Sequence, residues 1–118
     1  MNILVVGGGG REHAIAASLS KSPLTKRLVV APGNPGIETI AECYPVAADD
    51  IPGQCKLARD IEADFVFIGP EIPLVLGLKD ELLKLGISSF GPSKKAAQLE
   101  GSKTFSRNFC KRYNIPQP

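Results

Sequence analysis

Residues 2–14 read Asn2-Ile-Leu-Val-Val-Gly-Gly-Gly-Gly-Arg11-Glu-His-Ala14, and this pattern predicts a strand, a tight turn and the start of a helix. The aliphatic run from Ile3 to Val6 has no polar alternation, which is typical of a strand buried on both faces of a parallel sheet. The four glycines that follow let the backbone turn sharply and let a ligand approach its N–H groups. A helix that begins near Arg11 points its unsatisfied amides to the same place, so the stretch predicts an anion-binding site.

The usual nucleotide-binding loops do not fit this stretch. Counted from Gly7, the third small position of Gly-x-Gly-x-x-Gly/Ala is occupied by Glu12. Counted from Gly8, it is occupied by His13, and both side chains are too large and too polar for close helix–strand packing. The second predicted strand ends without the acidic residue that binds a ribose, and no Gly-Lys-Ser/Thr closes a Walker A loop. NAD or FAD binding is therefore disfavoured, and a glycine turn that binds nothing remains an alternative.

Composition excludes several function classes. A chain of 118 residues is enough for one domain, and 43% hydrophobic with 22% charged residues is ordinary for a soluble globular protein. The net charge of +2 is too small to indicate nucleic acid or an anionic membrane as the main partner.

Cys43, Cys55 and Cys110 are odd in number and lack metal-site spacing, so we expect reduced thiols and no zinc site. With no signal peptide and no apolar run of membrane length, we expect a cytoplasmic protein.

Strand and helix patterns alternate along the rest of the chain. Pro45 puts the third predicted strand at a strand start or a sheet edge. In the first helix we expect Ala14, Ile15, Ala17 and Leu19 to cover the sheet. The alternation predicts an α/β fold with a doubly wound, mostly parallel sheet of about five strands. The further predicted strands are 27–31, 44–48, 64–68 and 88–90, and the predicted helices are 11–22, 37–42, 53–62, 74–85, 93–100 and one that begins at 102.

Four turns rich in glycine and proline follow four of these strands. They are Gly7–Gly10, Pro32–Gly36, Gly69–Pro73 and Gly91-Pro92. The carboxyl ends of parallel strands lie at one edge of a sheet, which is where open α/β sheets bind ligands. The four turns are therefore predicted to converge on one pocket.

In these turns and their flanks, the chain resembles the N-terminal, pre-ATP-grasp domain of the glycinamide ribonucleotide synthetase (phosphoribosylamine–glycine ligase) family, which belongs to the ATP-grasp superfamily. The resemblance runs essentially from end to end. At the second turn the family pattern is Asn-Ala-Gly-Thr, whereas this chain has Asn34-Pro-Gly-Ile37, so a threonine hydroxyl is missing there. The stretches that carry the resemblance are Gly7-Gly-Gly-Gly-Arg-Glu-His-Ala14, Ala31-Pro-Gly-Asn34, Gly69-Pro-Glu-Ile-Pro-Leu74 and Phe90-Gly-Pro-Ser-Lys-Lys-Ala-Ala-Gln-Leu-Glu-Gly-Ser-Lys103.

This resemblance implies a ligase of purine biosynthesis that joins 5-phosphoribosylamine to glycine at the expense of ATP, with Mg²⁺. Residues 1–101 are then the domain that holds the sugar phosphate, and residues 102–118 are a helix and linker that lead to ATP-grasp domains. Those further domains would hold the glycine site, the magnesium ligands and most of the ATP site. The resemblance therefore implies that these 118 residues hold no catalytic or metal-binding residue and are inactive alone.

The resemblance and the chemistry of the side chains together give the substrate-binding candidates. Arg11 offers a charge-assisted contact to an acidic group of the substrate. Glu12 suits the helix dipole in any case, and a ribose or amine contact is its more specific role. Glu71 stands in a turn stiffened by prolines and suits two vicinal ribose hydroxyls. The whole set is Gly9, Gly10, Arg11, Glu12, Asn34, Glu71 and Pro73.

Two other residues are interpreted separately. Lys103 lies at a predicted helix start, where a cation is unfavourable, and its position resembles that of the ATP-grasp lysine that reaches an ATP phosphate. His13 is the only histidine, and we interpret it as a packing and hydrogen-bonding residue without a role in proton transfer. Two alternatives stay open, a stand-alone nucleotide- or NAD-binding module and another ATP-grasp carboxylase or ligase.

Overall fold

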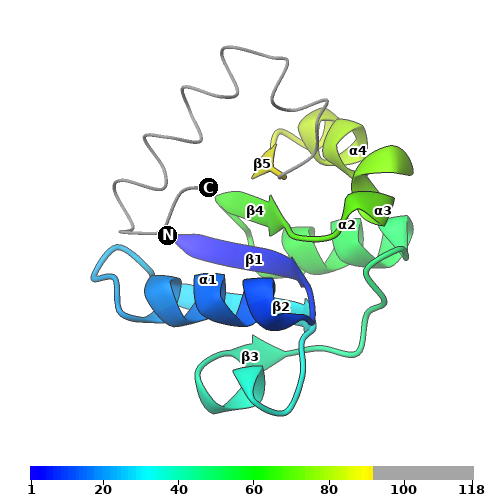
Figure 1. The fold of residues 1–118 in the computed structure, drawn as a ribbon. Coiled ribbons are helices and arrows are strands. Elements are labelled where there is room, and N and C mark those ends of the chain that lie inside the picture. The colour runs from blue at the N-terminus through cyan, green and yellow to red at the C-terminus, as the bar shows by residue number, and fades with distance from the viewer. Residues whose placement is uncertain (92–118) are drawn as a thin grey trace.

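A computed structural model describes residues 1–91, which form a parallel sheet with helices on both faces (Figure 1). The strand order is β3-β2-β1-β4-β5, and every neighbouring pair is parallel. The predicted α/β fold with a doubly wound sheet of five strands is confirmed. The elements predicted from residue 93 onward, and the domain boundary at residue 101, lie outside the described residues. The strands are β1 (Asn2–Gly7), β2 (Arg27–Pro32), β3 (Glu42–Cys43), β4 (Phe65–Ile68) and β5 (Ser88–Phe90).

The centre of the sheet is also the point where its winding reverses. From β1 the chain proceeds outward to β2 and β3, then crosses back to build β4 and β5 on the other side of β1. Ligands of doubly wound sheets bind at such a switch point, outside the carboxyl ends of the strands. In this fold the switch point lies between β1 and β4, so the turns at Gly7–Gly10 and Gly69–Pro73 stand on its two sides.

Alternate residues of the central strands build two hydrophobic layers. On one face, Ile3 and Val5 pack with helix α1 (Gly10–Ser20) through its residues Ile15, Ala16 and Leu19. Ala14 of the same helix is exposed, contrary to the prediction, because it lies off the face that Ile15, Ala16 and Leu19 define.

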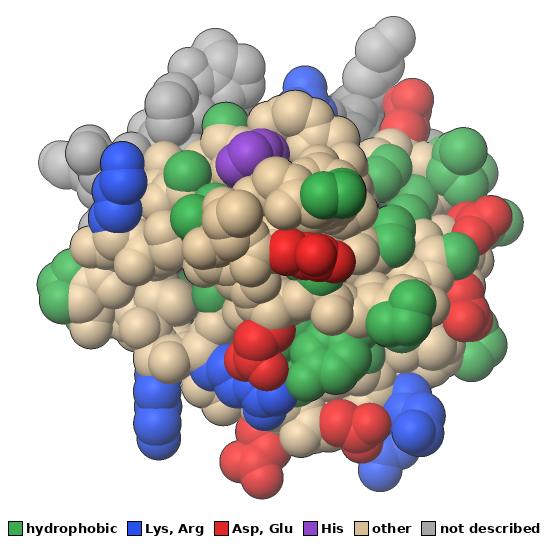
Figure 2. All heavy atoms as spheres, turned by 90° about the horizontal axis from the view of Figure 1, so that it is seen from below, with side chains coloured by type: hydrophobic (Ala, Val, Ile, Leu, Met, Phe, Trp, Pro, Cys, Tyr) green, Lys and Arg blue, Asp and Glu red, His purple; other side chains and the backbone are tan. Residues whose placement is uncertain are grey.

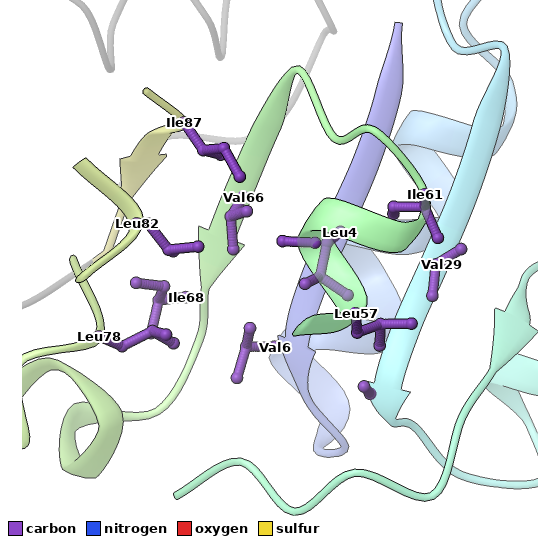
Figure 3. Packing of buried hydrophobic residues seen from close by; sticks show 12 residues of the cluster. Leu4, Val6, Val29, Leu57, Ile61, Val66, Ile68, Leu78, Leu82 and Ile87 are labelled. Atoms are coloured by element: carbon purple, nitrogen blue, oxygen red, sulfur yellow. The ribbon is translucent and has the colours of Figure 1, made fainter. Parts of the chain in front are cut away.

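The other face packs against helices α2 (Ile51–Asp60) and α4 (Leu78–Lys84). Figure 3 shows Leu4 and Val6 of β1, together with Val66 and Ile68 of β4, pointing toward these helices. Leu57, Ala58 and Ile61 form the buried stripe by which α2 and its C-terminal cap pack on the sheet. The carboxylate of Asp50 caps α2 by accepting a hydrogen bond from the Gly53 amide over 3.0 Å, and α2 therefore begins at Ile51, two residues earlier than predicted.

The third strand was predicted at the wrong residues. It is Glu42–Cys43, preceded by a short 3-10 helix η1 (Ile37–Thr39), and residues 44–48 form a loop. The reason is Gln54, which is fully buried in α2 and donates its amide to the carbonyl oxygens of Ala31 (3.2 Å), Val46 (3.2 Å) and Ala47 (3.0 Å). The loop carbonyls therefore turn toward α2 and do not pair with a strand.

The predicted helix 74–85 is two helices, α3 (Glu71–Val75) and α4. They are separated at Gly77, which has φ of +90°, a left-handed conformation that ends a helix. Leu78 and Leu82 are buried, whereas Val75 and Leu85, which share their helical spacing, are exposed because the break changes the direction of the chain.

Candidate functional site

The turns after β1 and β2 are joined by the side chain of Asn34. Its Nδ2 donates to the carbonyl oxygen of Gly8 over 2.8 Å, and its Oδ1 accepts from the amide of Ile37 over 2.9 Å. The backbone adds a third link, since the amide of Gly33 donates to the carbonyl oxygen of Gly7 over 3.0 Å. Both ends of the Asn34 amide are thus engaged within the protein, and the side chain fixes the second turn against the first.

These two turns approach so closely that a glycine is required at their contact. A Cβ atom placed on Gly8 would lie 2.5 Å from the carbonyl oxygen of Gly33. Gly33 itself has φ of +71°, and a Cβ atom on it would collide with the sulfur of Cys43. Packing under Gly33 leaves the Cys43 thiol half-buried, and this burial raises its pKa. Cys43 therefore supports the second turn as a neutral thiol.

The turns after β1 and β4 meet around Glu12, the third residue of α1. Its side chain is 6% exposed, and its Oε1 accepts a hydrogen bond from the amide of Gly9 over 3.1 Å. A Cβ atom on Gly69 would lie 2.5 Å from the carboxylate carbon of Glu12, and one on Gly7 would collide with Oε1. In addition, the amide of Gly69 donates to the carbonyl oxygen of Val6 over 3.0 Å. The carboxylate thus fills the space between the two turns.

The start of α1 is open toward the solvent. Gly9, Gly10 and Arg11 are exposed, and a Cβ atom on Gly10 would meet nothing within 4 Å. Gly9 has φ of −96°, so this loop needs glycine at positive φ only at Gly7. The first amides of a helix have no intrahelical acceptor, so the amides of Gly10 and Arg11 lie where an anion would be bound.

Glu71 and Pro73 begin the short helix α3 at the carboxyl end of β4. Glu71 is exposed and makes no hydrogen bond or ion pair with residues 1–91, whereas Pro73 is buried. Leu74 carries the contact to the fourth turn, because a Cβ atom on Gly91 would lie 2.7 Å from its Cδ1. The described turns therefore contact one another in pairs along one edge of the sheet. That they enclose one common pocket stays a prediction.

One further residue of this edge was not among the predicted substrate-binding residues. A Cβ atom on Gly36 would lie 3.0 Å from Cε1 of His13 and 3.2 Å from Oδ1 of Asn34, so the imidazole packs against the second turn. This contact supports the interpretation of His13 as a packing residue. No sequence pattern identified its partner, because Gly36 is 23 positions away in the chain.

On the face of the molecule that Figure 2 draws, the charged side chains do not form a continuous basic surface. Basic and acidic side chains are interspersed there. Within residues 1–91 no three His, Cys, Asp or Glu side chains are placed to hold a metal ion together. No helix of the same residues has the length and apolar character needed to cross a bilayer. Lys103, the predicted ATP-binding residue, lies outside the described part of the chain.

A family comparison identifies the relatives of this chain. The family described as phosphoribosylglycinamide synthetase, N domain, matches residues 1–100. The phosphoribosylamine–glycine ligase of Caulobacter vibrioides is 53% identical over 116 residues, which are 98% of this chain and 27% of that protein. The ligase of Haemophilus influenzae is 48% identical over 118 residues, covering 98% of this chain and 28% of its own length.

A solved structure of a phosphoribosylamine–glycine ligase also matches this chain. The crystal structure of the phosphoribosylamine–glycine ligase of Thermotoga maritima matches with a TM-score of 0.54 and 30% sequence identity, over 97% of this chain and 25% of that protein. This chain thus spans about a quarter of the length of the relatives it matches.

Proposed function

This chain belongs to the phosphoribosylglycinamide synthetase N-domain family, and from that premise we propose that it is the N-terminal part of a ligase that joins 5-phosphoribosylamine to glycine. In the proposed reaction the glycine carboxylate takes a phosphoryl group from ATP, which leaves as ADP. The amine of the sugar then attacks the glycyl phosphate, the amide bond forms and phosphate leaves. The product, glycinamide ribonucleotide, places the protein in purine biosynthesis.

We assign to this domain the binding of the sugar phosphate at the carboxyl edge of the sheet. The observation that carries the assignment is the open start of α1 beside the β1–β4 switch point, where Gly10 faces free space. Backbone amides at a helix N-terminus suit an anionic group, and the switch point is the usual ligand site of this architecture.

The proposed contacts use the hydrogen-bonding groups that have no partner within residues 1–91. Gly10 and Arg11 offer backbone amides, and the exposed guanidinium of Arg11 adds a charge-assisted contact to the phosphate. Glu71 is exposed with both carboxylate oxygens available to ribose hydroxyls, and the buried Pro73 anchors the short helix α3 that carries Glu71. Asn34 is committed to protein contacts, so its part is to shape the second turn.

ATP and Mg²⁺ are proposed for the complete ligase, with Lys103 on the ATP side. A dinucleotide is a poor fit to the described residues, because Glu12 fills the position that a small residue occupies in the dinucleotide fingerprint. A different ATP-grasp ligase would use other co-substrates. The choice among these functions therefore depends on which small molecules the protein consumes together.

The test is an ADP-release assay on the full-length protein that contains this chain. ADP should form at a useful rate only when ATP, glycine and 5-phosphoribosylamine are all present, and glycinamide ribonucleotide should accumulate in equal amount. ADP formation with bicarbonate or another amine in place of these substrates would assign the protein to another ATP-grasp activity. Tight binding of NAD without ATP consumption would favour the dinucleotide module.

A further inference from the structure

Glu12 is the only charged side chain that is buried in the described part of the chain. A buried carboxylate is unfavourable unless hydrogen bonds or charges compensate it. Here the amide of Gly9 donates to Oε1, and the position at the start of α1 adds the favourable field of the helix dipole. The carboxylate is therefore stabilised by the glycine loop that it also holds.

The same carboxylate touches the neighbouring turn across the switch point. Its carbon and Oε2 would lie 2.5 and 2.7 Å from a Cβ atom on Gly69, so a residue larger than glycine at this position would displace it. Gly7, with φ of +132°, leaves the matching space on the β1 side. Two glycines that are 62 positions apart thus create one compartment for Glu12.

We propose that Glu12 is a positioning residue that sets the spacing of the β1 and β4 turns and, by binding the amide of Gly9, the direction of the amides of Gly10 and Arg11. It acts on the substrate through the loop and makes no direct contact with it, because 94% of its surface is covered and Oε1 is already occupied. The identity of the affected substrate, 5-phosphoribosylamine, rests on the proposed function.

Two substitutions separate positioning from direct charge contact. Glu12→Gln keeps the volume and an acceptor for the amide of Gly9, but it removes the charge. Glu12→Ala removes the acceptor and leaves an empty space between the turns. A positioning role predicts that glutamine restores most of what alanine loses, whereas a charge contact predicts that both variants fail equally.

The kinetic experiment uses the full-length protein that contains this chain. We expect Glu12→Ala to raise KM for 5-phosphoribosylamine by about tenfold or more, which corresponds to the loss of one hydrogen bond of a charged group. KM for ATP and for glycine should change by less than about twofold, and Glu12→Gln should stay within about threefold of wild type for all three substrates. Glu62→Gln, an exposed carboxylate at the end of α2, is the matched control.

A double-mutant cycle tests the contact itself. Gly69→Ala alone should displace the carboxylate and raise KM for 5-phosphoribosylamine as Glu12→Ala does. In the double variant the added methyl group enters space that Glu12→Ala has emptied, so the two effects should be clearly less than additive. Full additivity would remove the contact between Glu12 and Gly69 from the explanation.

A second readout needs no substrate. Hydrogen exchange of the amide of Gly9, followed by NMR or in peptides that cover residues 7–13, should be slow in wild type and in Glu12→Gln and faster in Glu12→Ala. If wild type forms no ADP with 5-phosphoribosylamine, the proposed function fails while the exchange data still test positioning. Equal impairment of the alanine and glutamine variants, or unchanged exchange in Glu12→Ala, would overturn the proposal. If Glu12→Ala does not fold, Glu12→Gln and Gly69→Ala decide it.

Discussion

The side-chain amide of Asn34 donates to the carbonyl oxygen of Gly8 over 2.8 Å and so links the turns that follow two neighbouring strands. Its carbonyl oxygen accepts from the amide of Ile37 at the same time, over 2.9 Å. Asparagine suits this place because it carries a donor and an acceptor on one short side chain. The link holds the second turn against the loop that is proposed to bind the sugar phosphate.

Asn34→Asp should break the hydrogen bond to Gly8 and keep the one to Ile37, whereas truncation to alanine would remove both. Aspartate keeps an acceptor for Ile37 but turns a second oxygen toward the carbonyl oxygen of Gly8, so the local free energy of opening should fall by about 1–3 kcal/mol. Hydrogen exchange of the Gly33 amide, which donates to Gly7 in the same junction, measures this loss. Exchange at wild-type rates would show that the backbone contacts alone hold the two turns.

Substitution by alanine should lower thermal stability at Gly8 but leave it unchanged at Gly10. Gly8→Ala should lower thermal stability, because its methyl group would lie 2.5 Å from the carbonyl oxygen of Gly33, a backbone atom. Gly10→Ala should leave the melting temperature within about 1–2 °C, because nothing lies within 4 Å of its methyl group and alanine is a better helix former. Its methyl group would instead occupy the open space at the helix start, so KM for 5-phosphoribosylamine should rise. Normal kinetics of Gly10→Ala would make the loop a turn without a ligand.

The sequence was most informative where burial leaves a strong pattern. The aliphatic runs of β1, β2 and β4 are buried on both faces, so they read as continuous apolar segments and were predicted within one or two residues of their bounds. The turns that follow them were predicted from glycine and proline, whose backbone preferences are local. Local rules therefore predicted the edge of the sheet that carries the candidate site.

Features that depend on distant partners were missed or placed wrongly. The strand β3 has two residues at a sheet edge, too few for a pattern, and the loop after it is held by Gln54 from another element. The break at Gly77 was missed because leucines at helical spacing continue across it. The burial of Glu12 needs Gly69, a residue from another turn, and no local rule connects them.

Gln54 leads to a prediction about how the stability of a variant depends on pH. Its Nε2 is surrounded by three carbonyl oxygens, so Gln54→Glu would put a carboxylate in the place of a donor. Burial and the carbonyl dipoles raise the pKa of that introduced group in the folded state, so folding favours its protonated form. The variant should therefore be nearly as stable as Gln54→Met at pH 4 and should lose stability as the pH rises toward 8. Gln54→Met is the control, because it leaves the carbonyls unpaired without adding a charge, and equal loss for both variants at all pH values would contradict the argument.

The ion pair of Arg27 and Glu42 predicts a smaller dependence of stability on pH, in which stability falls as the pH decreases. The guanidinium contacts both carboxylate oxygens over 2.8 and 2.9 Å, and this hydrogen bonding lowers the pKa of Glu42 below 4.5, its ordinary value. A lowered pKa in the folded state gives stability that is present above pH 4.5 and is lost as the pH falls below it. Both side chains are partly exposed, so the contribution to stability should be small and should shrink further in salt. Glu42→Gln should remove this part of the acid dependence in thermal unfolding curves, and an unchanged curve below pH 4.5 would show that the pair contributes nothing measurable.

Glu71→Gln tests the proposed ribose contact directly. Glu71 is exposed at the start of α3, beside the switch point, and no residue of the described chain neutralises its carboxylate. A hydrogen bond between a charged acceptor and a neutral hydroxyl contributes about 1.5–3 kcal/mol, so its loss should raise KM for 5-phosphoribosylamine by about 10- to 100-fold. Because the folded structure does not use this carboxylate, the melting temperature should change little. Asp80→Asn is the matched control, since Asp80 is also an exposed acid in the first turn of a helix, α4, and loses the same favourable interaction with the helix dipole. KM values for ATP and glycine, measured on the same preparations, should stay near wild type in both variants. A Glu71→Gln variant that binds the sugar as Asp80→Asn does would remove Glu71 from the site and leave the phosphate contacts at α1 as its main determinant.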